Sequence, residues 1–112
     1  MTVEFELDGQ RFTALNGGPH FTFNEAVSFQ ILCDTQQEID YHWERLTAGG
    51  AEQPCGWLKD RFGVSWQVVP AQMYEVMANP DPAGMNRLSE AMFKMKKLDV
   101  GTLMRAYEGA AV

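Results

Sequence analysis

Two alternating segments on either side of one amphipathic segment constrain the fold of this 112-residue chain more than any other feature. Apolar and polar side chains alternate in AVSFQILC (residues 26–33) and in VSWQVV (residues 64–69), which is the period of a half-buried strand. Between them, one apolar stripe recurs at helical spacing: Ile39, Trp43 and Leu46. We therefore expect both strands in one curved sheet, with the helix on its convex side.

The intervening helix is predicted over residues 35–48. Thr35 and Glu38 have the spacing of a capping box, and Gly49-Gly50 follows the last apolar position, where glycine commonly ends a helix. In the strand before the helix, one face is wholly apolar and should meet a core; its members are Val27, Phe29, Ile31 and Cys33. The opposite face carries Ser28 and Gln30, which could face a ligand.

The two ends of the chain predict a hairpin and a set of helices. MTVEFEL and RFTALN alternate on either side of Asp8-Gly9, a strong two-residue turn signal. Residues 71–78 predict a short helix closed by Pro80, and Asp99 is a candidate cap for the last helix. Two further apolar stripes follow, Leu88, Met92 and Met95, and then Val100, Leu103, Met104 and Tyr107. The whole chain, residues 1–112, is predicted to form one α+β domain.

Composition limits which binding partners and which cellular location we expect for this protein. The net charge is −6 and the pI is about 4.7, whereas nucleic-acid binding usually requires a basic surface. Acidic residues interleave with the one basic cluster, which consists of Arg87, Lys94, Lys96, Lys97 and Arg105. The longest apolar runs are too short for a membrane span, and the first residues do not resemble a signal peptide. We expect no nucleic acid, no membrane and a cytoplasmic location.

Cysteine and glycine spacing give no cofactor motif. Cys33 and Cys55 have neither CxxC spacing nor a nearby histidine pair, so a zinc site is not expected. A disulfide between them is not expected in a reducing compartment. Cys33 is interpreted as a small apolar core residue. The glycine pairs Gly17-Gly18 and Gly49-Gly50 do not follow a strand and open a helix, which a nucleotide-type methyl-donor site would need.

The sequence resembles the PhnB-like branch of the glyoxalase/bleomycin-resistance, or vicinal oxygen chelate, superfamily in four stretches: VEFELDGQRFTALNGGP, SFQILCDTQQEID, GWLKDRFGVSWQVVP and EAMFKMKKLDVGTLMRAYEG. Members are often labelled 3-demethylubiquinone-9 3-methyltransferase. The resemblance implies a fold of two βαβββ modules around a cleft. Residues 26–70 correspond to the second module, residues 1–19 to the closing hairpin of an incomplete first module, and residues 71–112 to C-terminal helices.

The resemblance also implies where a metal would be held. Three of the family's ligand positions fall on Thr13, Ser28 and Gln67. These are neutral oxygen donors, poor ligands for a divalent ion, so we expect neither a metal nor another cofactor. His20, in the loop after Gly-Gly-Pro, and His42, on the helix, are more typical of loop and surface histidines, although His20 could reach the cleft as an acid or base.

These observations favour a metal-free module that binds a small molecule. The predicted cleft is lined by five polar side chains, with Trp57 or Trp66 as an apolar wall: Thr13, Ser28, Gln30, Ser65 and Gln67. Two alternatives stay open. One is a superfamily enzyme, either the methyltransferase of the label or a lyase, isomerase or dioxygenase, and the other is an assembly role without small-molecule chemistry.

We also expect a homodimer, because the incomplete first module leaves the hairpin with an unpaired edge and an uncovered apolar face. The helices over residues 85–108, with Met92, Met95, Leu103, Met104 and Tyr107, are candidates for extra contacts between subunits. The alternative is that these helices fold back over their own chain.

Overall fold

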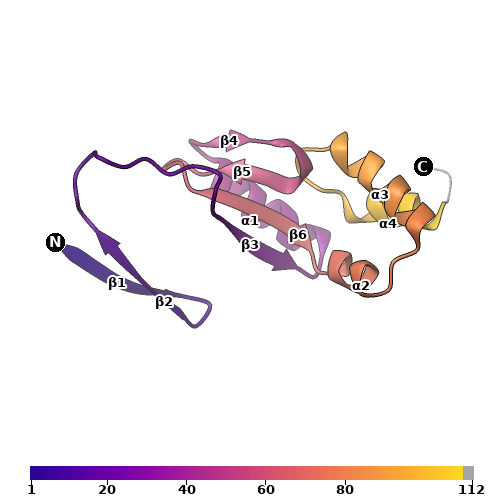
Figure 1. The fold of residues 1–112 in the computed structure, drawn as a ribbon, viewed down its shortest axis with the longest axis horizontal. Coiled ribbons are helices and arrows are strands. Elements are labelled where there is room, and N and C mark those ends of the chain that lie inside the picture. The colour runs from indigo at the N-terminus through magenta and orange to yellow at the C-terminus, as the bar shows by residue number, and fades with distance from the viewer. Residues whose placement is uncertain (110–112) are drawn as a thin grey trace.

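The fold was analysed in a computed structural model that describes residues 1–109 (Figure 1). A two-stranded hairpin, β1 (Thr2–Leu7) and β2 (Gln10–Leu15), precedes a four-stranded sheet, and helices occupy the C-terminal end. The chain is therefore α+β, as predicted. The last three residues of the predicted C-terminal helical region, 110–112, lie outside the described residues.

The larger sheet has the order β3-β6-β5-β4. Its strands are β3 (Ser28–Cys33), β4 (Ala51–Glu52), β5 (Trp57–Lys59) and β6 (Ser65–Pro70), with a short 3₁₀ turn, η1 (Pro54–Gly56), between β4 and β5. β3 and β6 are parallel neighbours, and the other pairs are antiparallel. The helix α1 (Gln36–Thr47) connects β3 to β4 and covers one face of the sheet (Figure 1). The predicted strand–helix–strand unit is confirmed.

α1 begins with a capping arrangement close to the predicted one. The Thr35 hydroxyl accepts a hydrogen bond from the Glu38 backbone N–H at 3.2 Å. The Glu38 carboxylate accepts from the N–H of Asp34 at 3.0 Å, one residue earlier than in a standard capping box. Two otherwise unpaired backbone donors are satisfied in this way, so the helix start is sharply defined.

The core between α1 and the sheet is formed by Cys33, Ile39, Trp43, Leu58 and Val68. The predicted apolar face of β3 reaches this core only in its second half. Ile31 and Cys33 pack there, whereas Phe29 is 39% exposed and Val27, which precedes the strand, is 67% exposed. The prediction that all four side chains meet the core was wrong, because the packing of α1 ends before it reaches the start of β3.

A second core joins the three C-terminal helices, α2 (Gln72–Ala78), α3 (Pro82–Phe93) and α4 (Val100–Glu108). Its buried members are Met73, Leu88, Leu98 and Leu103, and the half-buried side chains packed on them include Met92, Met95, Met104 and Tyr107. These side chains, predicted as candidate subunit contacts, pack within their own chain. The Asp99 carboxylate caps α4, as predicted, by accepting from the Thr102 N–H at 2.9 Å. Among residues 1–109, no helix has both the length and the apolar character needed to cross a membrane.

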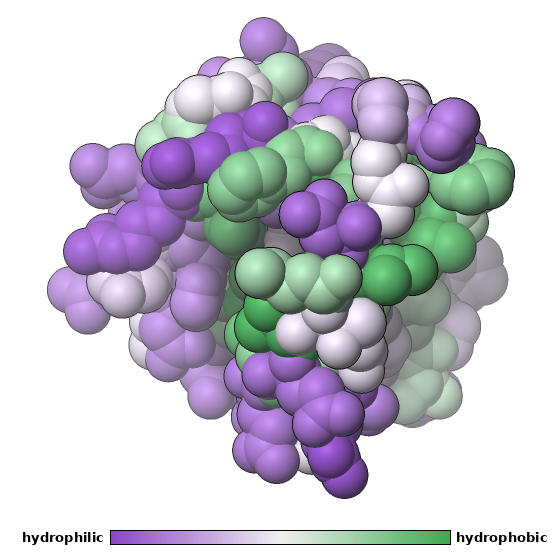
Figure 2. All heavy atoms as spheres, turned by 90° about the vertical axis from the view of Figure 1, so that its left-hand side faces the viewer, coloured by the Kyte–Doolittle hydropathy of each residue, from purple (hydrophilic) through white to green (hydrophobic). Residues whose placement is uncertain are grey.

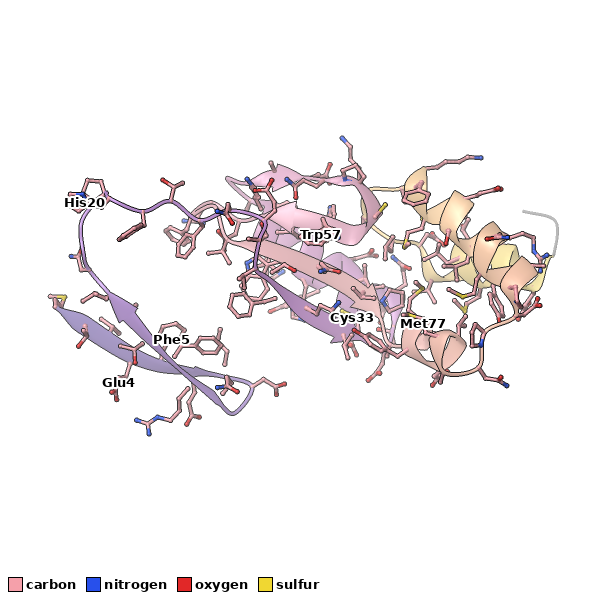
Figure 3. The ribbon with its side chains drawn as sticks, viewed as in Figure 1. Glu4, Phe5, His20, Cys33, Trp57 and Met77 are labelled. Carbon is pink, nitrogen blue, oxygen red and sulfur yellow. The ribbon has the colours of Figure 1, made fainter. Side chains whose placement is uncertain are left out.

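The hairpin lies apart from both cores (Figure 1). Asp8 and Gly9 form its turn with φ values of 51° and 77°, which matches the predicted Asp-Gly signal. Every residue of β1 is exposed, and β2 has only one half-buried residue, Phe12. Val3, Phe5, Leu7 and Phe12 share one face of the hairpin, whereas Leu15 lies on the other. Figure 3 shows Phe5 on the side toward the sheet and Glu4 on the opposite side.

Candidate functional site

Four polar side chains form a continuous hydrogen-bonded chain on the sheet face opposite α1, which we call the polar row. The Gln67 amide donates to the Ser28 hydroxyl at 2.9 Å, and the Gln30 amide donates to the Gln67 carbonyl oxygen at 3.3 Å. The Tyr74 hydroxyl, from α2, donates to the carbonyl oxygen of Gln30. The parallel register places Gln30 beside Gln67, so neighbouring strands bring the two amides together.

The polar row lies on an open surface. Trp57 is the cross-strand neighbour of Gln67 on β5 and is half-buried. Leu32, next along β3 on the same face, is 53% exposed, and Tyr74 is 46% exposed. The row therefore presents neutral hydroxyl and amide groups to solvent rather than to an enclosed space.

A partly open recess lies instead between the hairpin, the loop before β3 and the first residues of β3 and β6. This cavity has a volume of about 730 Å³ and is lined chiefly by apolar side chains, of which six are aromatic: Phe5, Phe12, Phe23, Phe29, Phe62 and Trp66. We call it the aromatic cavity. Figure 2 views this end of the molecule and shows apolar side chains gathered around a recess, with polar side chains at the periphery.

Successive ring contacts connect the hairpin to the sheet along the cavity wall. The rings of Phe5 and Phe12 are stacked with centroids 5.5 Å apart, and Phe12 meets Phe29 edge to face at 5.8 Å. Phe29 in turn lies 5.4 Å from Trp66. Aromatic pairs at these separations contribute more than their buried area alone. The hairpin is thus held against the sheet by the same rings that line the cavity.

The carboxylate of Asp60, in the cavity wall, already accepts hydrogen bonds from its own chain. Asp60 accepts backbone N–H bonds from Phe62 at 2.8 Å and Val64 at 3.1 Å, and its second oxygen accepts from the Trp66 indole N–H at 3.0 Å. The Ser65 hydroxyl is different, because Ser65 is 1% exposed and its oxygen has no hydrogen-bond partner among the described residues. Alternation along β6 directs the Ser65 side chain to the face of Gln67 rather than that of Trp66, so the cavity offers mainly apolar and aromatic surface.

The structure divides the predicted site residues between these two places. Ser28, Gln30 and Gln67 meet in the polar row, beside Trp57, as the alternation of β3 and β6 implied. Thr13 and Ser65 line the aromatic cavity instead, together with Trp66. One cleft that contains all the predicted residues does not form, because Thr13 belongs to the separate two-stranded hairpin and Ser65 lies at the start of β6, beside the cavity.

Two parts of these sites were not predicted from the sequence: Tyr74 in the polar row, and the hairpin's aromatic residues in the cavity wall. Tyr74 completes the polar row, but it lies on a short helix whose position over β3 is a tertiary property. The aromatic residues of the hairpin were predicted as an apolar face without a partner. The signal that was available is the density of phenylalanine before residue 30, at positions 5, 12, 21, 23 and 29.

The residues at the implied metal positions do not fit a divalent cation. Ser28 and Gln67 are hydrogen-bonded to each other, and Thr13 belongs to the other sheet. All three are neutral donors, which Zn²⁺ or Fe²⁺ bind weakly. In the part of the chain that the structure describes, no three His, Cys, Asp or Glu side chains come together as a metal site.

A methyl-donor site of the nucleotide-binding type is not formed by the glycine pairs either. Gly17-Gly18 lies in the loop after β2, and Gly49-Gly50 follows α1. Neither pair turns directly from a strand into a helix, so neither presents a helix N-terminus to a bound nucleotide.

The two cysteines and His20 belong neither to the polar row nor to the lining of the aromatic cavity. Cys33 is fully buried in the first core, and burial, with smaller contributions from Glu38 and Asp34, raises the pKa of its thiol to about 11. Cys33 and Cys55 are both free thiols. His20 is exposed on the loop after the hairpin and does not line the aromatic cavity (Figure 3).

The β-α-β-β-β order of residues 28–70 and its sheet order define a glyoxalase-like module. A family model described as 3-demethylubiquinone-9 3-methyltransferase matches residues 1–69. The chain belongs to this PhnB-like family.

Two solved structures are similar. A PhnB protein from Bacillus cereus has 34% sequence identity and a TM-score of 0.59, with 63% of this chain and 64% of that protein covered. Protein PA1353 from Pseudomonas aeruginosa has 20% identity and a TM-score of 0.52, with 62% of each chain covered, which supports the fold alone. The chain thus spans less than two thirds of the length of each. No curated protein matches the sequence.

Proposed function

We propose that this PhnB-like protein binds an uncharged, largely aromatic small molecule in the aromatic cavity, without a metal. The observation that carries the proposal is the cavity itself, about 730 Å³ between the hairpin and the sheet, with six aromatic side chains in its wall. Ligand sites are typically concave, apolar spaces of roughly 300–1,000 Å³ with a few polar groups. Flat rings in the ligand would pack against Phe12, Phe29 and Trp66.

The polar groups of the cavity determine the charge of the ligand. Both carboxylate oxygens of Asp60 accept hydrogen bonds from its own chain, and within residues 1–109 no lysine, arginine or histidine lines the cavity. A charged ligand would lose its hydration without gaining an ion pair, which is costly in an apolar site.

Metal-dependent and methyl-transfer reactions have less support from the residues. The donors at the implied metal positions are neutral, and the glycine pairs do not form a methyl-donor site. The proposal is therefore a binding function for a member of a family whose label names an enzyme.

The probe for this proposal is 4-fluorophenol, one ring with one hydroxyl, followed by ¹⁹F NMR. We expect its signal to broaden and shift on addition of the protein, unchanged by EDTA or added Zn²⁺. Phe29→Ala should weaken binding at least about ten-fold, the equivalent of the roughly 1.4 kcal/mol that one aromatic contact can supply. Phe93→Ala is the matched control, because Phe93 is 71% exposed on α3 and does not line the cavity.

Two results would refute the binding site. One is the absence of any ¹⁹F change with the wild-type protein at millimolar probe. The other is equal binding by the Phe29→Ala and Phe93→Ala variants. Binding that requires added Zn²⁺ would refute the metal-free part of the proposal.

A further inference from the structure

One carboxylate contacts three other residues of the aromatic cavity wall. Asp60 follows β5, and its Oδ1 accepts from the backbone N–H groups of Phe62 at 2.8 Å and Val64 at 3.1 Å. Its Oδ2 accepts from the indole N–H of Trp66 at 3.0 Å. All three donors belong to residues that line the cavity, and so does Asp60 itself. One side chain therefore connects the turn before β6 to the first aromatic residue of β6.

The turn has backbone hydrogen bonds of its own. The Asp60 N–H donates to the Val64 carbonyl at 3.0 Å, and the Gly63 N–H donates to the Asp60 carbonyl at 3.0 Å. Gly63 has a φ of 86°, which glycine adopts without strain. The path of the turn thus depends less on the carboxylate than the orientation of Trp66 does.

Trp66 connects the aromatic cavity to the first core. Its ring lies 5.4 Å from the ring of Phe29, and it also packs against the buried cluster beneath α1. An indole N–H that is withdrawn from water usually has an acceptor, and here Asp60 is that acceptor. A charged acceptor makes a stronger hydrogen bond than a neutral one. The bond to Asp60 therefore fixes the rotation of the indole that a bound ring would meet.

The same carboxylate brings a negative charge to the cavity wall. Within residues 1–109, Asp60 has no ion-pair partner, and no lysine, arginine or histidine lines the cavity. Hydrogen bonds spread this charge but do not remove it. Charges interact more strongly in a partly buried, apolar recess than in water. An anionic ligand is therefore opposed both by its lost hydration and by Asp60.

We propose that Asp60 determines the specificity of the aromatic cavity, because it orients Trp66 for ring stacking and repels ligands with a negative charge. The cavity then accepts a phenol and rejects a benzoate of the same size. This inference rests on the proposed binding function. Asp60 acts on the ligand through Trp66 and through its charge, without a bond to the ligand.

Asp60→Asn removes the charge and the indole contact while it keeps the turn. The amide oxygen still accepts from the N–H groups of the turn, but the NH₂ group cannot accept from the indole. Glu52→Gln is the matched control, because Glu52 Oε1 accepts from the Trp43 indole N–H at 2.7 Å and neither residue lines the cavity. Asp60→Ser, whose hydroxyl can accept from the same turn, is a second variant with the same expected effect.

Two probes of similar size measure the specificity by ¹⁹F NMR. Near pH 7, 4-fluorophenol is neutral and 4-fluorobenzoate is anionic. The wild-type protein should bind the phenol at least about ten-fold more tightly than the benzoate, and Asp60→Asn should reduce this ratio at least about five-fold. Glu52→Gln should keep the wild-type ratio. A general loosening of the cavity would weaken both probes alike and leave the ratio unchanged.

The orientation of Trp66 is measured without a ligand. In ¹H–¹⁵N spectra of the free protein, Asp60→Asn should shift the Trp66 indole N–H signal and speed its exchange with water, while the Trp43 signal stays in place. Glu52→Gln should have the opposite pattern.

The outcomes separate this inference from the proposed function. An unchanged probe ratio in both Asp60 variants, or an unchanged Trp66 indole signal in Asp60→Asn, would overturn the inference and leave the binding function intact. No binding of 4-fluorophenol to the wild-type protein would refute the proposed function, and the inference with it.

Discussion

Gln30 and Gln67 show how the residues of the polar row limit its chemistry. Gln67 donates to Ser28 while it accepts from Gln30, and Gln30 accepts from Tyr74. Amides neither ionise nor transfer protons near neutral pH. At the scale of single residues, the polar row is therefore a hydrogen-bonding surface and not an acid–base pair.

Cys33 gives a testable consequence of burial. Its thiol pKa is raised from 9.0 to about 11, mainly because burial disfavours the thiolate. With iodoacetamide at pH 8.5, native protein should be labelled at the half-buried Cys55 and not at Cys33, and both should react in urea. The raised pKa also stabilises the fold below about pH 9, and this contribution is lost as the pH rises through 11. Native labelling of Cys33 at the rate of Cys55 would contradict this account.

At the scale of the elements, the larger module was predictable because its local signals agree with its packing. β3, α1 and β6 lie within two residues of their predicted bounds, and Ile39, Trp43 and Val68 occupy the core. The length of β3 that α1 covers was not predictable. Alternation assigned Val27 and Phe29 to the same face as Cys33, but no local pattern shows where a neighbouring helix stops covering a strand.

The packing of α3 against α4 depends on one buried glycine. A Cβ atom on Gly84 would lie 2.8 Å from the Tyr107 ring and 2.9 Å from the Tyr107 carbonyl oxygen. Gly84→Ala should therefore lower the free energy of unfolding by about 1–3 kcal/mol through overpacking. In Gly101→Ala, the Cβ atom would lie 3.0 Å from the flexible end of Arg105 and 3.6 Å from Asp99 Oδ1, an ordinary contact, so this matched helix variant should be neutral or slightly stabilising. Urea denaturation compares the two, and an equal loss in both would exclude overpacking as the cause.

At the scale of the whole molecule, the positions of the two ends relative to the sheet could not be predicted. The hairpin has an apolar face, but its sequence does not show which surface that face meets, and the aromatic cavity results from this tertiary arrangement. The C-terminal helices are attached more strongly, since Cys55 and Gly56 donate backbone hydrogen bonds to Met95 and Lys96 at 2.9 and 2.8 Å.

Gln36 also connects the two cores, and this contact can be tested. Its amide nitrogen donates to the Leu98 carbonyl at 3.0 Å, and its oxygen accepts from the Val100 N–H at 2.8 Å. Gln36→Ala leaves both backbone groups without this partner and should cost about 1–3 kcal/mol of unfolding free energy. Gln37→Ala, at the exposed neighbouring position, is the control and should change stability little. Equal thermal stability of the two variants would show that Gln36 does not hold the helices to the module.

The proposed binding site is tested most directly by locating the bound probe. Nuclear Overhauser contacts between 4-fluorophenol and the protein distinguish the two candidate places, because Phe29 and Trp66 project from the opposite sheet face to Gln30 and Gln67. We predict contacts to the rings of Phe12, Phe29 and Trp66. Contacts to Trp57 and Tyr74 instead would place the ligand on the polar row and contradict the proposed site.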